Sequence, residues 1–304
     1  MCLEMIFVTC FMCLMLAVDG MAQKQYQKSK IQRFSVASDK IVPILLSSSQ
    51  ILLRLGNGAF TQGYSVGLEK DEGESETYSI LRLLGYKVAE SNTVPIRESK
   101  IEPIILYEFE GCPYCKRVRE ALVLLDLDAL FLPTPKGSPY FRPEAKNLGG
   151  KTQFPFMIDP NNDDLQMYES DKIIEYLYEQ YGKGLEIPKP LESNLVNTLS
   201  LATSSLLRFN KGSTYVEAKP VSKEKPLVLY GYEASPFCKI VRERLVELEL
   251  PHIQRTCGRG SSKRNELYMK TGRFQVPYLE DPNTDVKLFE SADILDYLNE
   301  VYVV

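Results

Sequence analysis

Short apolar runs alternate with helical periodicity in two separate parts of the chain. Residues 104–107 and 227–230 are apolar throughout, a pattern that suits strands buried on both faces of a sheet. A turn follows each run and ends in a proline, Pro113 or Pro236. Apolar residues then recur at the spacing of an amphipathic helix, so the pattern predicts a strand followed by a helix in each part.

Both parts continue with the same order of elements. A second strand and a loop lead to an X-Pro strand, and an Asp-Pro-Asn turn joins that strand to another one in a hairpin. A Glu-Ser pair then opens a last helix. This order predicts an α/β fold of two tandem thioredoxin-like domains, each a mixed four-stranded sheet flanked by helices. The hairpin strands are expected at residues 156–158, 165–168, 278–279 and 286–289.

The two parts are copies of one another. Ten of nineteen positions are identical between residues 104–122 and 227–245, which are offset by 123 positions. The X-Pro segment with its Asp-Pro-Asn turn, and then the Glu-Ser segment, recur with offsets of 122 and 121 positions. Because order and spacing persist with only single-residue gaps, the pattern indicates an internal duplication.

The amino-terminal hundred residues carry targeting signals and no recognisable chemistry. Residues 5–18 have no charged side chain, as in the apolar core of a signal peptide, and residues 21–38 are basic without an acid, as in transit peptides. Together they predict that residues 1–38 are a two-step targeting segment for a plastid, with a signal peptide followed by a transit peptide. A secretory protein, a membrane-anchored protein and a mis-assigned start are the alternatives. Residues 39–100 are expected to form a partly helical extension, with one helix over residues 41–55.

The remaining boundaries follow from the repeat. Domain one is expected at residues 101–183 and domain two at residues 226–304. Residues 184–225 would form a helical linker, with a helix near residues 191–207 and with proline and lysine at the domain edges. We expect the apolar faces of the two domains to meet each other or the helix over residues 41–55.

Charge and histidine content exclude several function classes. The net charge is −4 and no basic stripe is present, so no nucleic-acid partner is expected. Membrane contact is expected only through the N-terminal apolar segment, if it is retained. His252 is the single histidine, which argues against Ser-His-Asp triads, Cys-His pairs and His-ligated zinc. We expect a surface or half-buried His252 without a catalytic task, and no bound metal.

The motif Cys112-Pro-Tyr-Cys115 lies between a predicted strand and the start of a helix. There a Cys112 thiolate would meet unpaired backbone N–H groups and the positive end of the helix dipole. This placement lowers the pKa of a thiol from roughly 8.5 into the range of about 3.5 to 7.5, and Lys116 would add to the field. Cys115 is placed to resolve a mixed disulfide. Half of a zinc or cluster site and a purely structural cysteine pair are the alternatives.

Each copy resembles the N-terminal, glutathione-binding domain of glutathione S-transferases, and the CPYC motif makes the first copy similar to glutaredoxins. Residues 103–302 as a whole resemble a plant and algal family of tandem transferase-type thioredoxin folds, many of them plastid-targeted. The resemblance implies that Cys112 is a nucleophile and that Cys115 resolves. Ser235, which replaces the first cysteine in the second copy, would stabilise a glutathione thiolate and leave Cys238 without a CxxC partner.

The resemblance also implies a glutathione pocket in each copy, with glutathione as co-substrate. The prolines of Phe154-Pro155 and Val276-Pro277 are expected to be cis and to hold the cysteinyl backbone. The Glu-Ser pairs would hold the γ-glutamyl end, while a helix cap without a ligand is the alternative. The residues expected to contact glutathione are Tyr114, Lys116, Phe154, Pro155, Glu169 and Ser170 in the first copy, and Phe237, Val276, Pro277, Glu290 and Ser291 in the second.

Two features depart from the transferase pattern. A transferase continues this domain with an all-helical domain of roughly a hundred residues, whereas 43 residues follow the first copy and two follow residue 302. Cys257 lies in a Cys-Gly-Arg-Gly-Ser loop and is expected to be a free surface thiol.

Three functions fit these observations. The first hypothesis is a glutathione-dependent thiol–disulfide oxidoreductase that acts on disulfide or glutathionylated protein substrates. The second is a non-catalytic tandem module that binds glutathione or a protein partner. The third is a glutathione transferase or isomerase that lacks the usual helical C-terminal domain.

Overall fold

The computed structural model describes residues 38–54, 56–71, 73, 77–95, 101–192, 211–219 and 225–304, together with positions 197, 199, 200, 203 and 208. Apart from Ser38, the expected targeting segment lies outside the described residues. None of the described helices combines the length and the apolar character that a membrane span requires.

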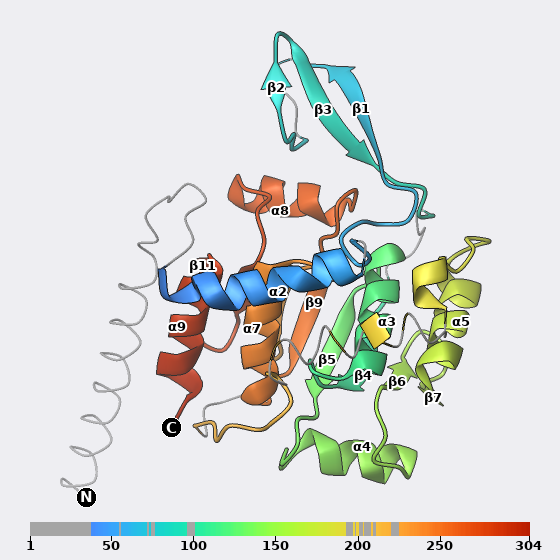
Figure 1. Ribbon diagram of the computed structural model, residues 1–304, viewed down its shortest axis with the longest axis vertical. Helices are drawn as coiled ribbons and strands as arrows, with labels where there is room; N and C mark the ends of the chain where they lie inside the picture. The colour runs from blue at the N-terminus through green and yellow to red at the C-terminus, as the bar shows by residue number, and fades with distance from the viewer. Residues whose placement is uncertain are drawn as a thin grey trace, which may run out of the picture.

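The first thioredoxin-like unit, called module one, has the predicted order of elements (Figure 1). Strand β4 lies parallel to β5 and antiparallel to β6, and β6 forms a hairpin with β7. The sheet is therefore mixed, with the strand order β5-β4-β6-β7. The elements are β4 (Ile104–Glu108), α3 (Pro113–Leu124), β5 (Ala129–Pro133), α4 (Phe141–Gly149), β6 (Phe156–Asp159), β7 (Leu165–Tyr168) and α5 (Ser170–Tyr181).

The second unit, module two, repeats this arrangement. Strand β8 lies parallel to β9 and antiparallel to β10, which pairs with β11. The predicted fold class is confirmed for both copies. The elements are β8 (Leu227–Gly231), α7 (Pro236–Glu247), β9 (His252–Thr256), α8 (Lys263–Thr271), β10 (Tyr278–Asp281), β11 (Val286–Phe289) and α9 (Ser291–Tyr302).

The edge strands β5 and β9 pair antiparallel and join the two modules. Leu130 and Ile253 are Cα partners at the centre of this pairing, and they are also equivalent positions of the repeat. The modules are therefore related by a pseudo-twofold axis through this pair. Within the described residues their strands form one eight-stranded sheet in the order β11-β10-β8-β9-β5-β4-β6-β7.

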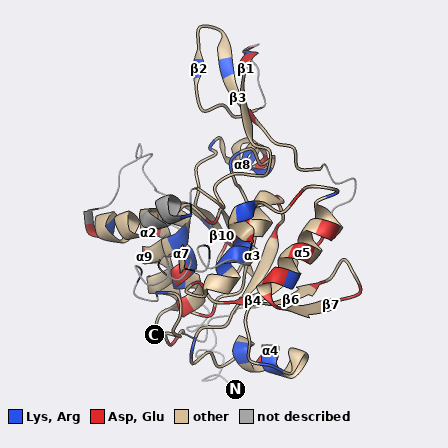
Figure 2. Ribbon diagram, turned by 45° about the vertical axis from the view of Figure 1, so that its right-hand side comes forward, with Lys and Arg blue, Asp and Glu red and all other residues tan. Residues whose placement is uncertain are grey.

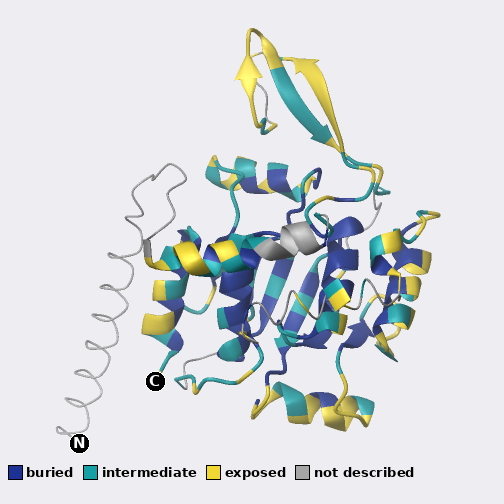
Figure 3. Cartoon of the chain, in the orientation of Figure 1, coloured by how far each residue is buried: buried dark blue, intermediate teal, exposed yellow. Residues whose placement is uncertain are grey.

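Each module has its own buried core (Figure 3), and the repeated Asp-Pro-Asn turn anchors it. The buried Asp159 carboxylate accepts hydrogen bonds from Tyr176 and Tyr181 of α5, at 2.6 and 2.5 Å. Asp281 accepts the equivalent bonds from Tyr297 and Tyr302 of α9, at 2.7 and 2.5 Å. The turn motif thus ties each hairpin to the last helix of its module, because a buried carboxylate needs donors.

The N-terminal extension contains a short 3₁₀ helix η1 (Ser38–Lys40), the helix α2 (Ile41–Leu53), which confirms the expected helix, and a three-stranded sheet that the sequence did not predict. Strands β1 (Ser65–Lys70), β2 (Arg82–Leu83) and β3 (Tyr86–Ser91) form an antiparallel sheet in the order β1-β3-β2 that projects from the body of the molecule (Figure 1). In the linker, η2 (Lys189–Leu191) and helical positions 197, 199, 200 and 203 are described, and the rest of the expected helix lies outside the described residues.

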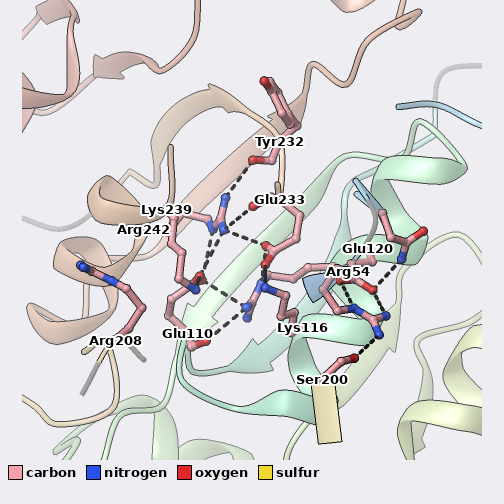
Figure 4. Close-up of polar contacts among 12 residues, drawn as sticks. Arg54, Glu110, Lys116, Glu120, Ser200, Arg208, Tyr232, Glu233, Lys239 and Arg242 are labelled. Atoms are coloured by element: carbon pink, nitrogen blue, oxygen red, sulfur yellow. Dashed lines mark hydrogen bonds and ion pairs between the residues drawn. The ribbon is translucent and has the colours of Figure 1, made fainter. Parts of the chain in front are cut away.

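Between helices α3 and α7 the contact of the two modules is ionic, which corrects the expectation that their apolar faces meet each other. The alternative expectation, a contact with the helix over residues 41–55, agrees with the packing of α2 against α7. The facing helices α3 and α7 carry basic residues (Figure 2) that pair with acids near the end of β4 and β8 (Figure 4). We call this set the ionic cluster. Its ion pairs cross between modules: Arg119 Nε lies 2.9 Å from Glu233, and Arg242 Nε lies 3.1 Å from Glu110. The members are Glu108, Glu110, Lys116, Arg119, Glu233, Lys239 and Arg242, all nearly inaccessible to solvent.

Two further buried arginines enter this interface from outside the modules. Arg54, just after α2, forms a bidentate pair with Glu120, and Arg208 of the linker forms one with Glu243. Glu120 and Glu243 are equivalent in the repeat. The internal duplication thus includes these two arginine–glutamate pairs as well as the thioredoxin-like fold.

The segments that follow these arginines are also equivalent, and we call residues 56–62 and 211–216 the arms. Each arm forms a parallel bridge with a loop, Phe60 with Arg259 and Thr214 with Lys136. Each also contains a glycine with positive φ, at Gly58 and Gly212. A Cβ atom at Gly212 would lie 2.6 Å from Glu110 Cβ, so only glycine fits against the cluster there.

Candidate functional site

Cys112 occupies the N-cap of α3, as the CPYC motif predicted. Its backbone is extended, with φ −77° and ψ 119°, and Pro113 begins the helix. The Cys112 Sγ accepts a hydrogen bond from the Cys115 N–H at 3.2 Å. Burial opposes ionisation of this thiol, but the hydrogen bonds from Cys115 outweigh it, and the pKa of Cys112 is lowered.

Cys115 faces the interior and is fully buried. Burial raises the pKa of the Cys115 thiol, and the adjacent Cys112 raises it further. The Cys112 thiol therefore ionises more readily than the Cys115 thiol. The described cysteines, Cys112, Cys115, Cys238 and Cys257, are all free thiols. No group of three or more potential metal ligands occurs among the described residues.

The Phe154–Pro155 peptide bond is cis, as predicted, and brings backbone to the thiol. The Phe154 carbonyl oxygen lies 3.9 Å from the Cys112 Sγ. The Phe154 ring contacts Phe109 edge-on at 6.2 Å between centroids. The site thus combines the cis peptide group with two aromatic rings next to the Cys112 sulfur.

Arg142 is a site residue that the sequence analysis missed. Its guanidinium carbon lies 5.1 Å from the centroid of the Phe154 ring and 6.0 Å from that of Phe109. The Thr134 carbonyl accepts hydrogen bonds from Arg142 Nε and Nη2, at 3.3 and 3.1 Å, which fixes the cation beside the cis peptide. The internal duplication could have pointed to Arg142, because Arg264 lies over the ring of Tyr232 in the same way in module two.

Glu169 and Ser170 form the N-terminus of α5. Glu169 has φ 70°, an unusual conformation for a residue other than glycine, and its side chain is exposed. Its Oε1 accepts a hydrogen bond from Gln153 Nε2 at 2.5 Å. The buried Ser170 Oγ accepts one from Arg117 Nη1 at 3.3 Å. The first helical N–H groups and a nearby cation suit a ligand carboxylate here.

Module two repeats the geometry with a hydroxyl in place of the thiol. Ser235 caps α7 with φ −70° and ψ 119°, and its Oγ accepts a hydrogen bond from the Cys238 N–H at 3.2 Å. The Val276–Pro277 bond is cis, and Glu290 has φ 68°. Burial raises the pKa of the Cys238 thiol. We call the two places site one and site two.

Comparisons with known proteins identify the family of both modules. The family model described as "Glutathione S-transferase, N-terminal domain" matches residues 106–186 and 229–303, together more than half of the chain. The chain belongs to this family. The two matched segments coincide with the two modules, so each is a transferase-type N-terminal domain.

Solved structures of a Bombyx mori glutathione transferase, BmGSTD1, also match. The complex with GTT is 25% identical, covers 31% of this chain and 45% of that one, and has a TM-score of 0.26. The other structure is 16% identical, covers 48% and 79%, and has a TM-score of 0.25. The chain thus spans less than half of the first of these transferase chains. A comparison with curated protein sequences found no match.

Site two of the tandem transferase-type domains is more covered than site one. Phe237 and Glu290 are half-buried, whereas their counterparts Tyr114 and Glu169 are exposed. The extension packs here, with the Tyr78 ring 5.0 Å from that of Phe274. It also supplies an acid, since Glu90 pairs at 2.9 Å with Arg259 of the loop before α8.

Three expected positions are corrected by the structure. Lys116 is buried in the interface, where its Nζ lies 3.7 Å from Glu233, so it does not face a ligand at site one. His252 is fully buried rather than at the surface, and burial lowers its pKa to about 4. Cys257 is a free thiol, as expected, but it is buried in a cluster with Tyr230, Leu267 and Tyr278 rather than exposed.

The pH dependence of alkylation tests the electrostatics of site one. Because the pKa of Cys112 is lowered, its reaction with iodoacetamide should reach its half-maximal rate at a lower pH than the reaction of an unperturbed cysteine in a model peptide measured in parallel. Mass spectrometry of the Cys112 peptide measures this rate. The Cys238 peptide is the internal control and should stay unmodified, because that thiol is buried with a raised pKa. An inflection for Cys112 at the same pH as the model peptide, or at a higher pH, would contradict the assignment.

Proposed function

We propose that the chain is a glutathione-dependent thiol–disulfide oxidoreductase, with Cys112 as nucleophile and Cys115 as resolving thiol. One observation carries the proposal. The Cys112 Sγ caps a helix and accepts the Cys115 N–H, next to the peptide group of a cis-proline. This arrangement supports a thiolate in reach of a cysteine-containing peptide.

The proposed reaction has two steps. The Cys112 thiolate attacks the sulfur of a disulfide or a glutathionylated protein, forms a mixed disulfide and releases the other sulfur as a thiolate. Cys115 then attacks the Cys112 sulfur and the bound thiol leaves, or a glutathione thiolate attacks the glutathionyl sulfur bound to Cys112, forms glutathione disulfide and releases the Cys112 thiolate. In the first route the enzyme dithiol gives two electrons to the substrate disulfide, and in the second the glutathionyl group of the substrate and one glutathione molecule leave together as glutathione disulfide.

Glutathione binding at site one is supported by three groups. The Phe154 peptide can pair with the cysteinyl backbone of glutathione, and the N-terminus of α5 with Glu169 and Ser170 suits its γ-glutamyl end. Arg142, held between aromatic rings and the Thr134 carbonyl, suits the second carboxylate. The family to which both modules belong carries glutathione in its name. The CPYC motif extends the proposal to a glutaredoxin-like first module.

Ser235 favours a second candidate function for module two. Its hydroxyl occupies the place of the Cys112 sulfur, and a hydroxyl can donate a hydrogen bond to a glutathione thiolate but does not exchange with disulfides. Module two would then bind glutathione without catalysis. Because the N-terminal extension covers site two, we expect glutathione to occupy site one first.

Calorimetric titration with glutathione, combined with an exchange assay, tests the proposal. Reduced wild type should bind glutathione at site one and reduce a glutathionylated peptide. Cys115→Ser should still deglutathionylate the peptide, because free glutathione can take the resolving role. Loss of all activity in Cys115→Ser, with binding intact, would contradict the assignment of Cys112 as the attacking sulfur.

The same titration separates the two sites. Ser235→Ala should leave the stoichiometry unchanged if only site one binds, and should remove one site if module two binds as well. Absence of glutathione binding in wild type would exclude both functions.

A further inference from the structure

The first turn of α4, the helix that carries Arg142, is bound by a side chain of the other module. Glu249 lies in the turn between α7 and β9, and its side chain is almost fully buried. Its Oε1 accepts hydrogen bonds from the Tyr140 and Phe141 N–H groups, at 3.1 and 2.8 Å. The N–H groups at the start of a helix have no partner within the helix, and an acid also suits the positive end of the helix dipole. A carboxylate of module two therefore caps α4 of module one.

The buried Ser138 carries this contact on to Arg142. The Ser138 Oγ donates a hydrogen bond to the Glu249 carboxylate and accepts one from the Arg142 N–H at 3.1 Å. The next residue, Pro143, has no N–H group to satisfy. A chain of hydrogen bonds from Glu249 through Ser138 thus fixes the backbone of Arg142.

The loop between β5 and α4 is also held at a second point. The Lys136 N–H donates to the Ser213 carbonyl at 2.6 Å, and the Lys136 carbonyl accepts the Tyr215 N–H at 2.9 Å. The guanidinium of Arg142 donates in turn to the Thr134 carbonyl of this loop. The segment from residue 134 to residue 142 is therefore held from outside module one by a linker arm and by Glu249.

The equivalent acid of module one makes a different contact. Asp126 occupies the position of Glu249 in the repeat and is one methylene shorter. The Lys263 Nζ of α8 lies 3.2 Å from the Asp126 carboxylate and donates to the Asp126 carbonyl at 2.6 Å. Asp126 thus binds a side chain of α8, whereas Glu249 binds the backbone of α4. Asp126 is the matched control for Glu249.

We propose that Glu249 of module two is a positioning residue for site one, where it holds Arg142 in place to bind the glycyl carboxylate of glutathione. This inference rests on the glutathione binding proposed above. The Arg142 guanidinium carbon lies 5.1 Å from the ring centroid of Phe154, the residue of the cis peptide, so the cation stands at the site. A planar guanidinium binds a carboxylate through two parallel hydrogen bonds only when it is correctly oriented. Site one is therefore composed of both modules.

Two ligands that differ in one charge test the proposal. Reduced protein is titrated by calorimetry with glutathione and with glutathione ethyl ester, in which the glycyl carboxylate is neutral. Glu249→Leu removes the acceptor oxygens but keeps an apolar side chain of similar length. It should bind glutathione about tenfold more weakly than wild type does, because the charge-assisted pair with Arg142 is lost. Its affinity for the ester should equal that of wild type.

The selectivity of the loss separates positioning from general damage. Equal weakening for glutathione and the ester, or no weakening for either ligand, overturns the proposal. The pH dependence of Cys112 alkylation should be the same in Glu249→Leu as in wild type, and a shift would likewise overturn it. Glu249→Gln keeps an acceptor oxygen and should recover most of the affinity. Asp126→Asn, the matched control, should leave the affinities for both ligands unchanged.

A double-variant cycle tests whether Glu249 acts through Arg142. Arg142→Ala should weaken glutathione binding at least as much as Glu249→Leu does, and should also leave the affinity for the ester unchanged. The double variant should bind glutathione no more weakly than Arg142→Ala, because the group that Glu249 positions is already absent. Losses that add would show that Glu249 acts on glutathione by another route and would overturn the proposal.

Ser138→Ala keeps the inference testable if Glu249→Leu does not fold. It removes only the link to the Arg142 N–H and should weaken binding of glutathione, but not of the ester, by about threefold. Absence of this selective loss overturns the proposal. If wild type binds both ligands equally, the role of Arg142 and Glu249 fails while exchange activity leaves the proposed function intact. Absence of glutathione binding and exchange in wild type overturns both.

Discussion

Replacement of Cys112 by serine is expected to lower the second-order rate constant for reduction of a glutathionylated peptide by at least about a thousandfold. A serine hydroxyl does not ionise at neutral pH in this position, so the hydrogen bond from Cys115 and the helix terminus have no thiolate to stabilise. The rate is measured by coupled assay and by single turnover. Activity near the wild-type level would contradict the assignment of Cys112.

The molecule itself shows that this substitution fits structurally. Ser235 occupies the equivalent N-cap with nearly the same backbone angles and accepts the Cys238 N–H at the same 3.2 Å. Cys112→Ser should therefore keep its fold and its glutathione affinity, so a loss of rate reports chemistry. Cys238→Ala is the matched control in module two and should leave the rate unchanged, because that thiol is buried without a CxxC partner.

The local parts of this picture follow from the sequence. Residues 104–107 and 227–230 predict their strands because a strand buried on both faces needs a continuous apolar run. The cis prolines and the caps at Cys112 and Ser235 follow from a motif that occurs twice at conserved order and spacing. Each of these features depends on residues that are close together in the chain.

The predictions that were wrong or missing concern contacts between segments that are distant in the chain. Lys116 is one turn beyond Cys112, but the loop between β8 and α7 of the other module supplies an acid beside α3, and the lysine turns toward that acid, Glu233. The arms carried a readable signal, since Leu-Leu-Arg with glycine four positions later occurs at residues 52–58 and 206–212. This signal has neither helical nor strand periodicity, so only its partners in the interface reveal its role.

The three-stranded sheet of the extension was missed for a different reason. Its strands are short and mostly exposed, with apolar residues such as Leu68 and Leu83 directed to solvent. Burial therefore imposes no alternating pattern on these residues, and sequence patterns detect burial. Among the described residues, the base of this sheet contacts module two through Tyr78 and Glu90.

Replacement of Arg242 by methionine is expected to destabilise the fold by about 3–5 kcal/mol, because it removes one partner from a buried ionic network. Arg242 is almost fully buried, and its guanidinium contacts both Glu110 and Glu233. Urea denaturation at pH 7 measures the free energy of unfolding. Arg244→Met, on the same helix, removes a partly exposed pair with Glu247 and should cost no more than about 1 kcal/mol.

The pH dependence distinguishes a lost charge from a lost contact. Burial alone would raise the pKa of Glu110 and Glu233, but Arg119 and Arg242 outweigh it and hold both pKa values below the ordinary range. Such acids stabilise the fold above the unfolded pKa of about 4.3, and this stability is lost as the pH falls through the folded pKa. Without Arg242 the two folded pKa values rise, so the penalty of Arg242→Met should be largest near pH 7 and should shrink toward pH 4. A penalty of equal size at both pH values would mean that Arg242 supports the joined sheet by packing, and that the two modules are not held together by their charges.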